Sequence, residues 1–174
     1  MNMGSWTGIG LAERIRNLFS GMMSREKIKK PQREVPQRTY STEDLRKLAK
    51  QEELQRYFAV IANVTSPSGE DYTVEYVYGM FGWSAQIRAP PNAQDYKTVE
   101  SIIKDVMSGE RKVIGDTVIV VSSRNLLLSD VAGYIDAYSS HGLQNVKIVD
   151  ITPAKYIPKG IHPKVEKALA GLKL

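Results

Sequence analysis

Residues 117–151 read TVIVVSSRNLLLSDVAGYIDAYSSHGLQNVKIVDI, and the rest of the chain has to pack around this segment. The run 117–121 is apolar without alternation, which is typical of a strand covered on both faces. A helix is expected from about Ser129 to His141, where Gly142 stops it. A second apolar strand is expected over 146–151. This strand–helix–strand pattern predicts a right-handed βαβ crossover whose two strands are parallel neighbours.

Upstream of this unit, a helix is expected to begin at Ser41 and to end before the loop at 66–69. Ser41, with Asp44 three residues later, has the pattern of a capping box. Apolar side chains recur at helical spacing along the segment. They would form its buried side: Leu45, Leu48, Ala49, Leu54, Tyr57, Phe58 and Ile61.

Two strands and another helix are predicted between these units. Residues 72–78 alternate as a strand, and 84–89 pair back to form a hairpin. A helix over 96–107 would be capped by Asn92 and ended by Gly109. The fold class is therefore α/β: a helix followed by ββαβαβ, with a mixed sheet and helices mainly on one face.

The order of elements from Tyr72 to Ile151 resembles the small soluble module of the ExbD/TolR family of energy-transducing proteins. Members of that family are anchored by one transmembrane helix that carries a functional acidic residue. This sequence has no such helix, and a basic segment occupies its place. The resemblance therefore implies a fold and transfers no functional residue.

A length of 174 residues suits one domain with appendages. We predict an N-terminal amphipathic segment and extended basic arm over 1–40, a compact α/β domain over 41–152, and a basic, proline-containing tail with a short helix over 153–174. Apolar residues make up 42% of the chain, which is enough for a core. The absence of cysteine excludes disulfides, a thiol nucleophile and thiolate zinc sites.

No apolar run is as long as a membrane span, and the N-terminus lacks the apolar core of a signal peptide. The expected location is therefore intracellular (cytoplasmic), or within a virion or another large complex. Residues 9–19 form a short amphipathic segment whose apolar side would dock on protein. The alternative for this segment is contact with a membrane surface.

Charge is divided unevenly along the sequence. Residues 1–38 carry a net charge of +5 and residues 155–174 one of +4, whereas residues 39–154 carry −4. Cationic ends suit either nucleic acid or the acidic body of a neighbouring copy. The predicted contact residues for DNA, RNA or protein are Arg25, Lys27, Lys29, Lys30, Arg33, Arg38, Lys159, Lys164 and Lys167.

The turn of the predicted hairpin is unusually apolar. Met80, Phe81 and Trp83 lie between or beside its glycines. These side chains either fold back over the sheet or form a contact patch for a partner.

The sequence gives little support to catalysis. His141 and His162 lack metal-ligand spacing and are better explained as a helix-end residue and an exposed residue. Asp116, Asp130 and Asp150 would have to converge in one cleft to form a hydrolase or nuclease site. Ser122-Ser123-Arg124-Asn125, at the end of a strand, is read as a polar turn that leads to an N-cap at Ser129, with an anion pocket as the alternative.

No phosphate-binding glycine motif is present, and we expect no metal and no cofactor. The leading hypothesis is a non-enzymatic structural protein of a multi-subunit assembly or homo-oligomer. The alternative is sequence-independent binding of DNA or RNA by the basic ends.

Overall fold

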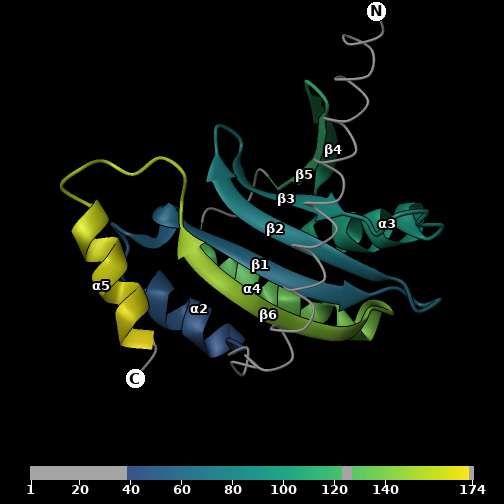
Figure 1. Cartoon of the computed structure of the whole chain (residues 1–174), viewed down its shortest axis with the longest axis horizontal. Helices are drawn as coiled ribbons and strands as arrows, with labels where there is room; N and C mark the ends of the chain where they lie inside the picture. Colours follow the sequence, from purple (N-terminus) through teal and green to yellow (C-terminus); the bar gives the residue numbers. More distant parts are fainter. Residues whose placement is uncertain (1–38, 123–126, 173–174) are drawn as a thin grey trace, which may run out of the picture. The chain divides into compact units, whose positions relative to one another are not determined.

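The structure, a computed structural model, describes residues 39–122 and 127–172, all within one compact unit (Figure 1). Several sequence predictions lie outside the described residues. They are the amphipathic segment and basic arm up to residue 38, with Arg25, Lys27, Lys29, Lys30, Arg33 and Arg38, and residues 123–126 of the polar turn.

A six-stranded sheet forms the centre of this unit, with the strand order β4-β5-β3-β2-β1-β6 and antiparallel pairing throughout. The strands are β1 (Phe58–Thr65), β2 (Asp71–Gly79), β3 (Gly82–Arg88), β4 (Glu110–Ile114), β5 (Thr117–Val121) and β6 (Gln144–Pro153). The helices are α2 (Thr42–Ala49), α3 (Tyr96–Met107), α4 (Leu128–Ala137) and α5 (His162–Leu172), with short 3-10 turns η2 (Gln55–Tyr57) and η3 (Ser139–His141). The predicted α/β class is confirmed.

The predicted pairing of the two apolar strands is wrong. β5 and β6 point in the same direction, but β3, β2 and β1 lie between them, so they are not neighbours and the sheet is not mixed. Instead, β3 of the β2–β3 hairpin pairs with β5, and β1 pairs with β6. Antiparallel partners therefore occupy the edges that a parallel crossover would have needed.

The long helix predicted from Ser41 is also wrong beyond its first two turns. The capping box is present, since the Ser41 N–H donates to Asp44 Oδ2 at 2.9 Å, but α2 ends at Ala49. Residues 58–65 instead form β1, an interior strand between β2 and β6. Its alternate residues Val60, Ala62 and Val64 are buried, as in a strand with one face on the core.

β4 is a strand that the sequence analysis missed. It is short, at the edge of the sheet, and begins with Glu, Arg and Lys, a composition that protects an edge strand from unwanted pairing. Together, β4 and β5 form a hairpin whose turn is Gly115–Asp116.

The hydrophobic core lies between one face of the sheet and the helices α3 and α4, so the expected helical layer is present (Figure 1). Alternate residues of β2 and β3 point into it, including Tyr76 and Trp83. The buried hydroxyls of Tyr76 and Tyr138 form a hydrogen bond across the core. Burial raises the pKa of both phenols, so both remain protonated in the folded protein.

Helix α3 confirms the prediction for residues 96–107, although its ends differ from those expected. Asp95, rather than Asn92, precedes the first helical residue. At the other end, the left-handed conformation belongs to Ser108, with φ 48°. Gly109 is required for another reason: a Cβ there would lie 2.8 Å from the Val121 backbone oxygen.

Replacing Gly109 with alanine should therefore destabilise the fold. The added methyl group would press on the backbone of β5, at a typical cost of about 1–3 kcal/mol. Gly133, inside α4, is a matched control because a Cβ there meets no atom within 4 Å. Gly133→Ala should stabilise the protein by about 0.5–1 kcal/mol in urea unfolding. Equal effects of the two substitutions would contradict this packing.

Glu70 joins the loop after β1 to the start of α3. Its carboxylate accepts the backbone N–H groups of Gln94 and Asp95, the latter at 2.8 Å, and the hydroxyl of Tyr72. These hydrogen bonds, led by that of Gln94, hold the pKa of Glu70 below its ordinary value of 4.5. The ionised form is therefore favoured by folding.

Glu70→Gln should lower the melting temperature at pH 7. A carboxylate whose pKa is lowered by folding stabilises the folded state fully at a pH above its pKa in the unfolded chain. This stabilisation is lost as the pH falls through its pKa in the folded protein. The two proteins should consequently converge only when they are melted at a pH below the lowered pKa of Glu70 in the folded protein. Asp105→Asn, at an exposed site on α3, is the control. A Glu70→Gln deficit that stays constant down to acid pH would show that the charge of Glu70 is not involved.

Candidate binding groove

Helix α5 is held beside the body of the protein by the segment that follows β6. The Ala154 N–H donates to the Tyr57 carbonyl at 2.7 Å, and Val165 on α5 is fully buried. Pro163 lies in the first turn of α5, where a missing N–H costs nothing. The predicted short helix of the tail is confirmed.

Helix α2 forms the other wall and is fixed to α4. Arg46 contacts Asp136 at 2.6 Å, and the Thr42 hydroxyl donates to the same carboxylate at 2.9 Å. The hydrogen bond that the Arg46 guanidinium donates to Asp136 is the main reason that the pKa of Arg46 is raised. Leu45 and Leu48 point inward, which leaves Lys47 at the surface.

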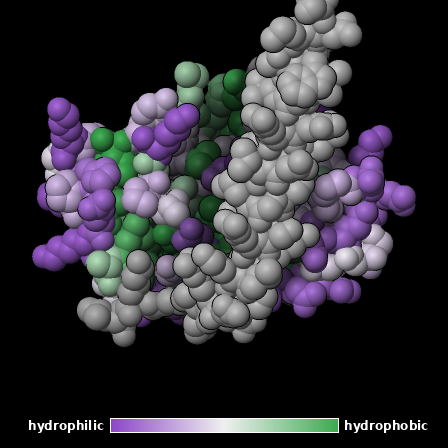
Figure 2. All heavy atoms as spheres, in the orientation of Figure 1, coloured by the Kyte–Doolittle hydropathy of each residue, from purple (hydrophilic) through white to green (hydrophobic). Residues whose placement is uncertain are grey.

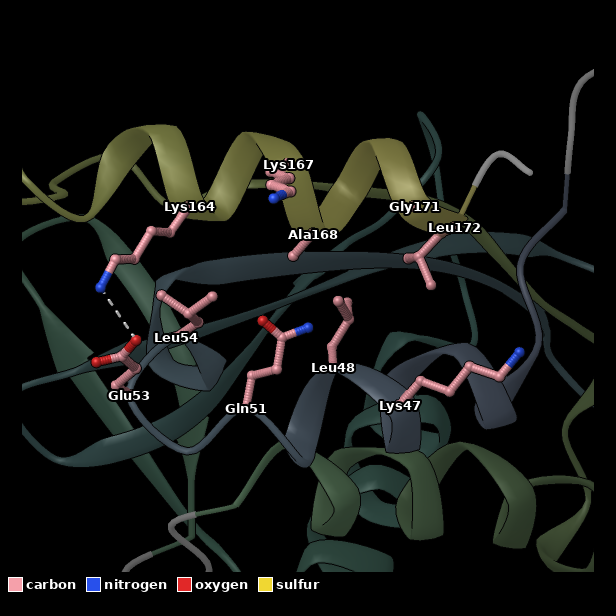
Figure 3. A pocket seen from close by; sticks show the side chains of 10 residues that line it. All are labelled: Lys47, Leu48, Gln51, Glu53, Leu54, Lys164, Lys167, Ala168, Gly171 and Leu172. Atoms are coloured by element: carbon pink, nitrogen blue, oxygen red, sulfur yellow. Dashed lines mark hydrogen bonds and ion pairs between the residues drawn. The ribbon is translucent and has the colours of Figure 1, made fainter.

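A groove of about 460 Å³ lies between the two helices (Figure 3). Its floor is apolar: Leu48 and Leu54 lie at the bottom and are almost fully buried, and the half-buried Ala168 and Leu172 line the accessible part. In Figure 2, hydrophobic surface is visible near α5 between hydrophilic side chains. The full lining is Lys47, Leu48, Gln51, Glu53, Leu54, Lys164, Lys167, Ala168, Gly171 and Leu172.

The rim of this groove is cationic. Lys164 contacts Glu53 at 3.3 Å, but neither Lys47 nor Lys167 has an acidic partner within residues 39–122 and 127–172. An apolar floor with two unpaired ammonium groups can bury apolar side chains of a ligand and at the same time neutralise its carboxylates.

The structure brings together two of the three tail lysines singled out from sequence, Lys164 and Lys167. Lys159 is exposed in the loop before α5 and does not line the groove. Lys47 was missed, because from sequence it is one charged residue on the solvent side of a helix. Its position next to Leu48 places it at the boundary between the polar and apolar sides of α2. This boundary lines a groove only because α5 docks beside α2.

The three residues of the predicted contact patch at the β2–β3 turn differ in how far they are exposed. Met80 is 94% exposed and Phe81 40%, whereas Trp83 is completely buried. The Lys112 ammonium on β4 lies 4.7 Å from the centre of the Phe81 ring, so Phe81 leans over the sheet. Trp83 packs edge-on against Tyr78. The surface of this turn is therefore made by Met80 and Phe81.

The acidic candidates occupy separate places. Asp116 is exposed at the β4–β5 turn, and Asp130 accepts the backbone N–H before α4 at 3.2 Å. Asp150 accepts the N–H of the next residue at 3.0 Å, and Asp136, another aspartate of α4, pairs with Arg46 of α2. Within the described ranges, no three His, Asp or Glu side chains gather closely enough to hold a metal ion.

The two histidines have structural contacts. His141 Nδ1 lies 2.9 Å from the Ala137 carbonyl at the end of α4, and His162 lies 3.6 Å from Glu166 on the same helix. The N-cap of α4 is Leu127 rather than the predicted Ser129. In the part of the chain that the structure describes, no helix has the length and apolar character needed to cross a membrane.

Comparison with known proteins gives no relative. No protein-family model matches the chain, and no curated protein or solved structure does either. The ExbD/TolR resemblance therefore stays a similarity in the order of elements.

Proposed function

We propose that this chain is a non-enzymatic structural or interaction protein of a larger multi-subunit assembly, such as a virus particle or a filament. The observation that supports this most is the groove between α2 and α5. Its floor is apolar, and two of its three lysines are unpaired among the described residues. Such a surface gains free energy when a complementary protein segment covers it.

The apolar floor favours protein over nucleic acid as the occupant of the groove. Phosphates would contact Lys47 and Lys167, but a sugar–phosphate backbone offers little apolar surface to cover the half-buried Ala168 and Leu172. A protein segment with apolar and acidic side chains would satisfy both parts of the groove.

In this proposal the basic arm supplies a second contact. Its six cations, Arg25 to Arg38, are followed by a body that carries a net charge of −4 over residues 39–154. The arm of one copy would lie on the acidic body of the next. The assembly would be built inside a cell and would remain there or be incorporated into a virion.

Neutralising part of the arm in the full chain tests this contact. Lys27→Gln/Lys29→Gln/Lys30→Gln should weaken self-association at least about tenfold, which corresponds to about 1.4 kcal/mol. The control neutralises Lys50, which is exposed directly after α2, and Lys97 and Lys104, which are exposed on α3, and should leave the mass distribution unchanged. Unchanged assembly of the arm variant, measured by sedimentation velocity, would remove the arm from the proposal.

The alternative is sequence-independent binding of DNA or RNA by the same cationic ends. It predicts an affinity for duplexes that falls steeply with salt, with a log–log slope of about −0.9 for each phosphate contacted. A fluorescence titration of labelled duplex at two salt concentrations distinguishes the two functions. Tight, salt-sensitive binding by a chain that stays monomeric without nucleic acid would favour the alternative.

A further inference from the structure

The turn between β4 and β5 exposes a short apolar and acidic segment. Val113 is 58% and Ile114 53% exposed, and Gly115 and Asp116 follow them at the surface. Val113 and Ile114 are consecutive in a strand, so they point to opposite faces, and neither face is covered at this end. Asp116 has no ion-pair partner among the described residues.

We propose that the β4–β5 turn of one copy inserts into the α2–α5 groove of a second copy, so that the chains associate head to tail. This inference depends on the proposed assembly function and identifies the segment that fills the groove. Val113 and Ile114 would cover the apolar floor, and Asp116 would lie between Lys47 and Lys167.

The topology requires the contact to be between copies. The turn belongs to β4, at one edge of the sheet, whereas α5 packs against β6, at the other edge. Five strand spacings of about 4.8 Å separate these edges, roughly 24 Å. A chain cannot place its own turn in its own groove without dismantling the sheet.

The two surfaces are complementary in charge and in apolar character. The groove carries Lys47, Lys167 and the Lys164–Glu53 pair, an excess of positive charge, and the turn ends in a carboxylate. Because the turn and the groove are different surfaces, the contact is heterologous. Heterologous contacts form rings when the rotation closes and filaments when it does not.

Two variants and their mixture test the contact in the full chain. The turn variant is Asp116→Lys, and the groove variant is Lys47→Glu/Lys167→Glu. Each should lose head-to-tail growth, with the dissociation constant raised at least about tenfold. Mixed in equal amounts, they should form dimers with one copy of each, because the intact turn of the groove variant fits the intact groove of the turn variant. These dimers should also grow further, because the free turn with Asp116→Lys and the free groove with Lys47→Glu/Lys167→Glu carry opposite charges and restore the contact with the signs exchanged.

A variant without a charge change separates sterics from electrostatics. Gly171 lines the groove, and a Cβ there would meet no atom within 4 Å, so the side chain in Gly171→Leu starts in open space and should occupy part of the groove. It should also stop growth, whereas Gly133→Leu on the exposed side of α4 should not. Unfolding curves identify any variant that fails to fold, and in that case the remaining variants decide the outcome.

The outcomes separate the inference from the proposed function. If the wild-type chain assembles and both charge variants and Gly171→Leu assemble equally well, the head-to-tail contact is overturned while the assembly function stands. If the wild-type chain is a monomer under all conditions, both are overturned. Assembly of the mixture of turn variant and groove variant, with monomers of each variant alone, would establish the contact.

Discussion

Replacing Trp83 with alanine is expected to lower the free energy of unfolding by about 3–5 kcal/mol, as is usual when a large aromatic side chain leaves a core. Trp83 is completely buried and packs edge-on against Tyr78, with 5.6 Å between the ring centres. Met80→Ala, three residues earlier, removes a side chain that is 94% exposed and should change stability by less than about 0.5 kcal/mol. Urea unfolding of both variants measures the difference.

Phenylalanine at position 83 refines the test. The Trp83 indole N–H is buried and has no hydrogen-bond partner among the residues described. Trp83→Phe removes this unsatisfied donor while keeping most of the ring, so it should recover much of the stability lost in Trp83→Ala. A Trp83→Ala protein as stable as Met80→Ala would mean that the indole lies on the surface, as a continuous contact patch would require.

Replacing Val60 with aspartate is expected to prevent folding. Val60 lies in β1 with no exposed surface, and a buried carboxylate without a partner costs several kcal/mol, a large part of a typical domain's 5–15 kcal/mol. Asn63→Asp, at an exposed site on the same strand, should be nearly neutral. Circular dichroism at 222 nm and sedimentation report the loss of structure.

This comparison also tests the correction made to residues 58–65. In the helix predicted from sequence, with Leu54, Phe58 and Ile61 on the buried side, Val60 would lie well away from the centre of that side. A folded, stable Val60→Asp protein would therefore favour the helix and contradict β1.

The elements that sequence predicted well are those with local signals. The hairpin β2–β3 has period-two alternation and glycines at its turn, and α3 has apolar residues at helical spacing. The capping box at Ser41 and the proline at the start of α5 are equally local. Each of these signals acts between residues a few positions apart, so it can be read without knowing the rest of the fold.

The errors arise where distant contacts decide the structure. Residues 58–65 carry apolar side chains at spacings that suit both a helix and an interior strand, and only pairing with β2 and β6 selects the strand. β4 begins with three charged residues, so it has no strand pattern of its own and depends on β5. The parallel neighbours predicted for β5 and β6 failed for the same reason, because β1 had been assigned to a helix.

Prediction of the candidate site from sequence is limited in the same way. Lys164 and Lys167 were selected for the charge of the tail, which is visible in sequence, and their shared position on α5 follows from the predicted helix. Lys47 joins them only because α5 docks beside α2, more than a hundred residues away in sequence. The apolar floor under these lysines is likewise a product of packing.

The most direct test of the account is the mass of the purified full chain, measured by mass photometry and sedimentation velocity at low and high salt, with and without added nucleic acid. We expect multimers that form from the protein alone, that need no nucleic acid, and that dissociate in part as salt screens the lysine contacts. A chain that stays monomeric at every protein and salt concentration, or that assembles only when nucleic acid is present, would contradict it.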